Sequence, residues 1–138
     1  METVQQNENA VRRCVEIFNQ RTTEFVDACF AENAEWIELP TAGRPAGRQG
    51  NRAFLREQQK QLLSLFPDRQ LTIRNLVAQG DQVVLEQDWS GTAAMDLGSV
   101  KAGSKVRLQI ASFFKLVDGL IVKQTDYCIS IRNEAANQ

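Results

Sequence analysis

Apolar and polar residues follow two different periods along the chain. In the first part apolar residues recur every three or four positions, as they do at Val11, Cys14, Val15 and Phe18. This spacing places them on one face of an amphipathic helix over residues 4–19. After Phe66 the pattern changes to alternation of polar and β-branched residues, which is typical of strands. The sequence therefore predicts helices first and a sheet afterwards.

Two further helices and one strand are predicted before the sheet-rich part. Thr23 is placed to cap a short helix, and Asn51 to cap a longer one that runs to Phe66 and ends before Pro67. Between them we expect a strand over 34–39. A loop is expected over 41–50, because glycine and proline residues concentrate there.

Four long strands are predicted as two hairpins. The first spans 69–79 and 82–92 around Gly80-Asp81, and the second spans 106–117 and 120–132 around Asp118-Gly119, a dipeptide suited to a tight turn. Strands of this length bend and twist strongly. We expect an α+β fold in which a cone-shaped, strongly bent antiparallel sheet and three N-terminal helices enclose a pocket.

Length and composition limit the possible functions. The 138 residues match a single domain, 1–138, of which 1–3 and 133–138 are expected to be flexible. Sixteen basic residues nearly balance 17 acidic ones, so we expect no nucleic-acid partner. Met1 to Ala10 has no signal-peptide pattern, and no apolar run approaches the roughly 20 residues that cross a bilayer. We therefore expect a cytoplasmic protein that does not bind membranes.

The chain contains no histidine. This excludes a catalytic triad with imidazole and any histidine-ligated metal site. The three cysteines are far apart and have no metal-binding spacing, and no glycine-rich nucleotide loop occurs. We expect neither a metal nor a cofactor.

Asp126 is the first candidate for catalysis. It stands in a strand otherwise rich in Ile, Val, Tyr and Cys, so its carboxylate must be either partnered or functional. Burial among apolar side chains raises the pKa of a carboxyl group, which suits removal of a proton next to a carbonyl. The alternative is an edge or interface aspartate that pairs with an arginine or lysine.

Glu38 is the second candidate. Strand alternation places it on the same face as Trp36, so a carboxylate would lie beside an aromatic wall. On the later strand Glu86 and Asp88 share one face and Trp89 lies on the other; we expect the carboxylates to be solvated or dimer-facing and Trp89 to line the cavity.

Other candidates have weaker chemistry. Cys128 shares the face of Asp126, but without histidine a packing role is favoured over a nucleophilic one. Arg44 and Arg48 could meet an acidic ligand at the cavity mouth, although ordinary solvation in the glycine-rich loop is favoured.

Five short motifs resemble one known family in sequence order. They lie at 30–36, 66–68, 80–84, 90–92 and 118–122, with the sequences FAENAEW, FPD, GDQVV, SGT and DGLIV. This order is similar to that of the SnoaL-like polyketide cyclases, which have the nuclear transport factor two-like fold, a cystatin-like roll. The resemblance covers about Val11 to Ile131.

The resemblance implies a small apolar ligand inside the cone, a strand aspartate as acid/base, matched by Asp126, and a homodimer through the outer sheet face. In the related ketosteroid isomerases a catalytic tyrosine would match Cys14, a second donor would fall near Ser112, and the base at or beside Glu38. In the related epoxide hydrolases the Arg-Asp-Tyr motif matches Thr125-Asp126-Tyr127, which has lost the arginine.

The leading hypothesis is a cofactor-free acid/base enzyme, of isomerase or cyclase type, that acts on a small apolar carbonyl compound. Asp126 and Glu38 would be catalytic. The residues expected to bind the substrate are Trp36, Trp89, Ser112, Phe114, Cys128 and Cys14. The competing hypothesis is a dimeric ligand-binding or accessory module without catalysis, and the weakest alternative is water activation as in an epoxide hydrolase.

Overall fold

The structure is a computed structural model that describes residues 3–131. Helix α1 (Val4–Asn19) begins at Thr3, whose hydroxyl accepts a hydrogen bond from the Gln6 amide while Thr3 N–H donates to Gln6 Oε1. Thr3 is therefore the cap of α1. The other residues predicted to be flexible, 1–2 and 133–138, lie outside the described part. The predicted apolar face of α1 is buried, as expected.

Helix α2 (Phe25–Cys29) differs from the prediction at its cap, and the strand after it begins at residue 30 rather than 34. Its cap is Glu24, which makes no side-chain capping bond, so the assignment of Thr23 as the cap is wrong. The Glu24 amide instead donates to the Thr22 hydroxyl at 3.3 Å. Strand β1 (Phe30–Glu38) follows α2 without a loop, because Phe30 already pairs with Ile121 in the sheet.

The predicted loop over 41–50 contains a short strand. Strand β2 (Arg48–Gly50) pairs with β1 in antiparallel register, which places Arg48 opposite Glu38. Helix α3 (Arg52–Leu65) follows it. As predicted, α3 is capped by Asn51, whose side chain accepts from the Phe54 amide at 3.0 Å.

The remaining strands form the two predicted hairpins. They are β3 (Gln70–Gln79), β4 (Gln82–Thr92), β5 (Lys105–Val117) and β6 (Leu120–Ile131). Asp118 and Gly119 have φ angles of 53° and 77°, as a type I′ turn requires. The sheet order is β2-β1-β6-β5-β4-β3.

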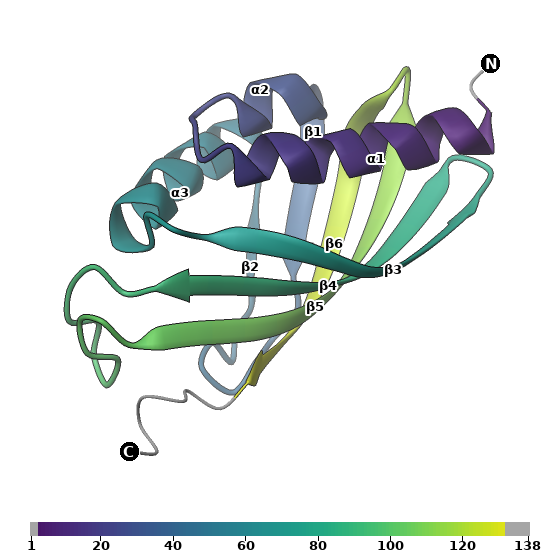
Figure 1. Cartoon of the computed structure of the whole chain (residues 1–138). Helices are drawn as coiled ribbons and strands as arrows, with labels where there is room; N and C mark the ends of the chain where they lie inside the picture. Colours follow the sequence, from purple (N-terminus) through teal and green to yellow (C-terminus); the bar gives the residue numbers. More distant parts are fainter. Residues whose placement is uncertain (1–2, 132–138) are drawn as a thin grey trace.

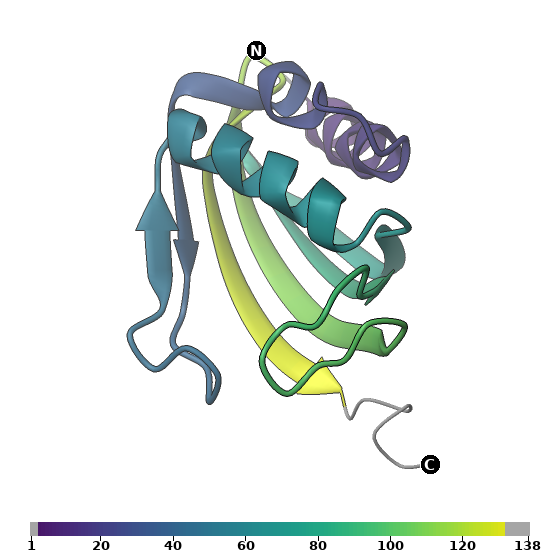
Figure 2. The same cartoon turned by 90° about the vertical axis from the view of Figure 1, so that its left-hand side faces the viewer.

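The sheet bends around the helices, and α3 lies across its concave side (Figures 1 and 2). The predicted α+β class and cone-like sheet are confirmed. In one respect the sheet differs from the prediction: β1 runs parallel to β6, so the six-stranded sheet is mixed rather than wholly antiparallel, and it is not closed. The parallel pairing is possible because a long connection, through β2, α3 and strands β3 to β5, separates β1 from β6.

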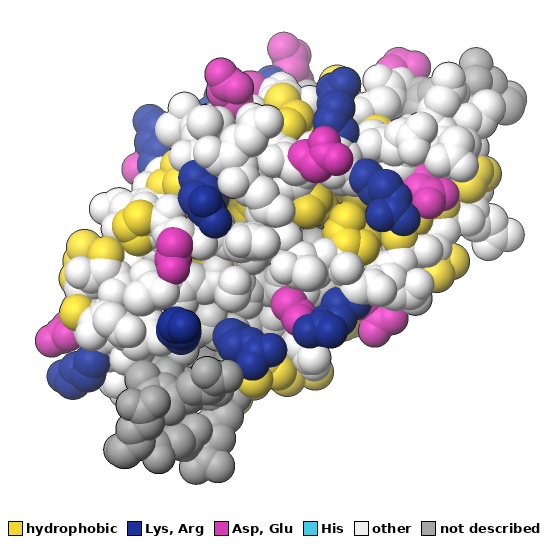
Figure 3. All heavy atoms as spheres, viewed as in Figure 1, with side chains coloured by type: hydrophobic (Ala, Val, Ile, Leu, Met, Phe, Trp, Pro, Cys, Tyr) yellow, Lys and Arg dark blue, Asp and Glu magenta, His cyan; other side chains and the backbone are white. Residues whose placement is uncertain are grey.

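Basic and acidic side chains are interspersed over the face drawn in Figure 3, without a large area of one charge. Within residues 3–131 none of the helices combines the length and apolarity needed to span a membrane.

Candidate active site

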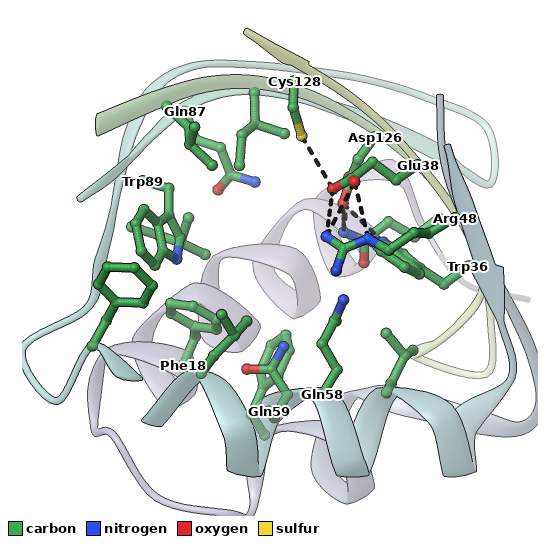
Figure 4. A pocket seen from close by; sticks show the side chains of 18 of the residues that line it. Phe18, Trp36, Glu38, Arg48, Gln58, Gln59, Gln87, Trp89, Asp126 and Cys128 are labelled. Atoms are coloured by element: carbon green, nitrogen blue, oxygen red, sulfur yellow. Dashed lines mark hydrogen bonds and ion pairs between the residues drawn. The ribbon is translucent and has the colours of Figure 1, made fainter. Parts of the chain in front are cut away.

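A cavity of about 230 Å³ lies between α3 and the concave face of the sheet (Figure 4). One part of it is apolar, and its wall includes Phe18, Phe25, Leu62, Phe66, Leu71, Trp89, Val106, Leu108 and Ile110. The polar side chains of the lining include Trp36, Glu38, Arg48 and Asp126, which lie together at one end, and Gln58, Gln59, Gln87, Gln124 and Cys128. The cavity can therefore hold an apolar molecule with a few polar atoms.

Asp126 lies on the wall of this cavity and is only 7% exposed. Its Oδ1 accepts from Ser112 Oγ at 2.6 Å, and its Oδ2 accepts from Trp36 Nε1 at 2.9 Å. Gln124 Nε2 donates to both carboxylate oxygens, at 3.0 and 3.1 Å. Within the described residues no arginine or lysine forms an ion pair with it. The alternative of an aspartate paired to a cation outside the pocket is therefore wrong.

The surroundings of Asp126 act on its pKa in both directions. Burial is the largest effect and raises the pKa above its usual value, because the ionised form loses its hydration. Hydrogen bonds from Ser112, Gln124 and Trp36 lower it, and the nearby charge of Glu38 raises it. The net direction is upward.

A hydrogen-bonded chain continues behind Asp126. Ser112 donates to Asp126 and accepts from Gln87 Nε2 at 3.1 Å. Ser112 is fully buried and lies behind Asp126 rather than in the cavity lining. Gln87 Oε1 and Gln124 Oε1 are buried, and neither has a hydrogen-bond partner within residues 3–131.

Glu38 shares the cavity-facing side of β1 with Trp36, as alternation predicted. Its carboxylate forms a bidentate pair with Arg48, in which Nε and Nη2 each lie 3.1 Å from an oxygen. The Arg48 guanidinium also lies over the Trp36 ring, at 5.3 Å from its centroid. The expectation of ordinary loop solvation for Arg48 is therefore wrong.

Gly47 makes this approach possible. Its φ is +66°, and a Cβ atom there would lie 2.5 Å from the Glu38 carbonyl oxygen. Only glycine allows β2 to come this close to β1 at that point.

Cys128 lines the cavity, and its Sγ lies 3.6 Å from Glu38 Oε2. Burial and the charges of Asp126 and Glu38 raise its thiol pKa to about 12. The thiol therefore stays protonated at neutral pH, which is unsuited to nucleophilic attack.

The other predicted site residues divide into two groups. Trp89 lines the apolar part and packs edge-to-face on Phe66 with centroids 5.0 Å apart. Phe114 and Cys14 do not line the cavity, which corrects their expected role in substrate binding. Both are buried in the core.

Two carboxylates predicted to be solvated or dimer-facing lie on the outer side of the sheet. Asp88 pairs there with Arg74, and Glu86 accepts from Asn75 at 3.2 Å. Within residues 3–131 no group of three or more His, Cys, Asp or Glu side chains could hold a metal ion.

Sequence reasoning did not identify Gln58, Gln59, Gln87, Gln124 and Arg48 as members of one polar site. Strand alternation could have identified two of them, because residues two positions apart share a face. Gln124 is two residues from Asp126, and Gln87 is two residues from Trp89. The helix pattern gave no comparable signal for Gln58 and Gln59, because it does not define which turn of α3 faces the cavity.

Comparison with solved structures finds the same fold at low identity. AclR from Streptomyces galilaeus, named as a candidate hydroxylase, is 17% identical with a TM-score of 0.79, covering 98% of this chain and 85% of its own. IdmH from Streptomyces antibioticus, named as a candidate polyketide cyclase, is 22% identical with a TM-score of 0.74, covering 91% of each chain. An LEH-like epoxide hydrolase from M. tuberculosis is 13% identical with a TM-score of 0.70, covering 91% of this chain and 84% of its own.

Comparison with curated proteins gives no significant match. The family assignment rests instead on the family comparison, in which residues 11–124 match the SnoaL-like domain. This match includes β1, α3 and the strands that form the cavity wall as far as Gln124. The chain therefore belongs to the SnoaL-like domain family.

Proposed function

We propose that the protein is a cofactor-free acid/base enzyme, of isomerase or cyclase type, that acts on a small apolar carbonyl compound. The observation that carries the proposal is the position of Asp126: a buried carboxylate on the wall of a largely apolar cavity, held by neutral donors. A carboxylate without a cationic partner keeps a high affinity for a proton.

The ionised Asp126 would accept a proton from a carbon next to the substrate carbonyl. The C–H bond breaks, its electron pair forms the carbon–carbon double bond of an enolate, and the carbonyl π pair moves to the oxygen. Asp126 is then neutral. It returns the proton to another carbon in an isomerisation, or to an oxygen after the enolate carbon has attacked a second carbonyl in a cyclisation.

The neighbours of Asp126 have separate roles in this proposal. Ser112, Trp36 and Gln124 fix the carboxylate orientation, which aligns it with the C–H bond. Glu38 is held by Arg48 and faces Asp126 as a negative charge, which favours the protonated form of Asp126. We therefore assign Glu38 to tuning Asp126 rather than to accepting the proton.

The test is turnover by Asp126→Asn. Wild-type protein incubated with a panel of small diketones and conjugated ketones should isomerise or cyclise one of them, while Asp126→Asn should lose at least about a thousandfold in rate with its fold retained. The matched control is Asp88→Asn on the outer face, which should keep the wild-type rate. Full activity of Asp126→Asn on a converted compound would sink the proposal.

A non-catalytic ligand-binding module is the second candidate. It is favoured by one observation: three side chains already donate to the Asp126 oxygens, as they would to a purely structural carboxylate. Mass spectrometry of compounds released from the purified protein separates the candidates, because a binding module returns its ligand chemically unchanged.

A further inference from the structure

Arg69 is a cation in the protein core. It precedes β3, is 0% exposed, and its guanidinium carbon lies 4.2 Å from the centroid of the Phe18 ring. No carboxylate of residues 3–131 forms an ion pair with it, and its Nε and Nη2 atoms are buried without a hydrogen-bond partner. The adjacent Asp68 is engaged elsewhere, because its oxygens accept from the Thr92 amide and hydroxyl. A buried cation without a counter-charge is costly, so it favours negative charge nearby.

The positive charge of Arg69 reaches the cavity through Gln59. Arg69 Nη1 donates to Gln59 Oε1, and Gln59 lines the cavity wall on α3. Because arginine has only donors, this bond fixes which end of the Gln59 amide is the oxygen. The Nε2 group is thereby left for the cavity, and Figure 4 shows the nitrogen of Gln59 directed into it.

We propose that Gln59, polarised by Arg69, binds a negatively charged oxygen of the ligand at the wall opposite Asp126. This inference rests on the proposed function, in which proton removal by Asp126 moves an electron pair onto the substrate carbonyl oxygen. Gln59 Nε2–H donates to that oxygen as it becomes an enolate, and the Arg69 charge behind the amide strengthens the bond.

The placement of the two groups also restricts the substrate. Gln59 and Asp126 project into the cavity from α3 and β6, on facing walls (Figure 4). A substrate that reaches both must carry its acidic C–H, next to a first carbonyl, at one end and the oxygen of a second carbonyl at the other. Transfer of the electron pair between the two ends requires a conjugated path, so the substrate class is an extended, conjugated carbonyl compound. Phe18 and Trp89 supply flat apolar walls for such a molecule.

Binding of 4-nitrophenol and 4-nitroanisole tests the subsite without a known substrate. Above its pKa the phenol presents a delocalised negative oxygen, whereas the methyl ether is neutral and of similar shape. Wild-type protein should bind the phenolate about tenfold or more tightly than the ether, a preference typical of a charge-assisted hydrogen bond. Gln59→Leu should bind the phenolate and the ether about equally. Gln59→Glu places a carboxylate next to the Arg69 guanidinium, so this variant should bind the neutral ether more tightly than the phenolate.

Gln58→Leu is the matched control, because Gln58 lines the same cavity and Gln59, not Gln58, accepts from Arg69. It should leave the ratio of the two affinities unchanged. Near-ultraviolet circular dichroism of each variant verifies the fold, and the ratio itself is insensitive to a loss of folded protein. Equal binding of both probes by wild-type protein, or an unchanged ratio in Gln59→Leu, would overturn the proposal.

The probe-binding experiment and the turnover experiment can fail independently of each other. Asp126→Asn should retain the phenolate preference, because the subsite lies on α3. Loss of turnover in Asp126→Asn together with equal probe binding would reject the subsite alone. A retained preference together with full activity of Asp126→Asn would reject the acid/base role of Asp126 alone.

Discussion

Glu38 and Asp126 lie opposite each other in the register of the parallel strands β1 and β6, but within residues 3–131 only Glu38 is paired with an arginine. The two carboxylates therefore have different environments at one end of the same cavity. Arg48 stabilises the charge of Glu38, whereas burial disfavours the charge of Asp126. The pKa of Asp126 is raised as a result.

The raised pKa of Asp126 predicts a pH-dependent stability. In the folded state Asp126 holds its proton at pH values where the unfolded chain, with the ordinary pKa of 3.8, has already lost it. The stability contributed by this group is therefore full below pH 3.8 and is lost as pH rises to the folded-state pKa. Urea unfolding of wild-type protein and Asp126→Asn over this range should show wild type losing stability relative to the variant as pH rises. A constant difference at every pH would contradict the raised pKa.

Ser112→Ala should destabilise the protein. It removes a donor from Asp126 and leaves Gln87 Nε2 without its acceptor inside the core. We expect a loss of about 1–3 kcal/mol in the free energy of unfolding. The pKa of Asp126 should rise further, because the Ser112 bond is the largest of the effects that lower it. Ser90→Ala, at an exposed strand position, is the control and should change stability by less than about 0.5 kcal/mol. Equal losses of stability in the two variants would show that the hydrogen bonds of Ser112 to Asp126 and Gln87 do not stabilise the protein.

Local patterns predicted the part of the site that depends on strand alternation. Trp36 and Glu38 share one face of β1, and Asp126 and Cys128 share one face of β6, as a period of two requires. Alternation does not distinguish residues that line the cavity from residues that are packed in the core. Phe114 lies on the inner face of β5, like Ile110, but further along the strand, where it packs in the core rather than at the cavity. Whether Phe114 meets the core or the cavity depends on where the helices cross the sheet, and alternation does not determine that position.

The role of Arg48 could not be predicted because it depends on the pairing of β2 with β1. The amino-acid composition of this segment predicted a loop instead of a strand. Glycine and proline residues around 41–47 indicated a loop, yet Arg48 to Gly50 pair with β1. The sequence order of Arg-Asp-Tyr in related hydrolases had suggested that an arginine was missing from the site. The structure supplies one from β2, although it bonds to Glu38 rather than to Asp126.

Gly47→Ala should displace Arg48 from Glu38. The new Cβ would meet the Glu38 carbonyl oxygen, and the φ of +66° disfavours any side chain. We expect a loss of at least about 1 kcal/mol in the free energy of unfolding, measured by urea denaturation. Gly43→Ala is the matched control in the same loop, because a Cβ atom there would have no neighbour within 4 Å and the φ of Gly43 is not in the left-handed region. An equal loss in both variants would show that the close approach at Gly47 is unimportant.

Cys128 should resist alkylation although it lines the cavity. With a thiol pKa of about 12 instead of 9.0, its thiolate fraction at neutral pH is lower by about a thousandfold. Mass spectrometry after iodoacetamide treatment should show slow modification in folded protein and fast modification in guanidinium chloride. Similar rates in both states would contradict the raised pKa. In Glu38→Gln the rate should increase, because one of the charges that oppose the thiolate is removed.

We propose that two copies of the chain pair through the outer face of the sheet. Phe113, Tyr127 and Ile129 are 45%, 46% and 66% exposed there, and the rings of Phe113 and Tyr127 pack with centroids 5.5 Å apart. Exposed apolar side chains that cluster on neighbouring strands are typical of an interface. Sedimentation at micromolar concentration should give twice the chain mass of 15.5 kDa, and Ile129→Lys should give monomers because a lysine charge would be buried. Met95→Lys, at an exposed loop position, should remain dimeric. A wild-type monomer under these conditions would contradict the proposal.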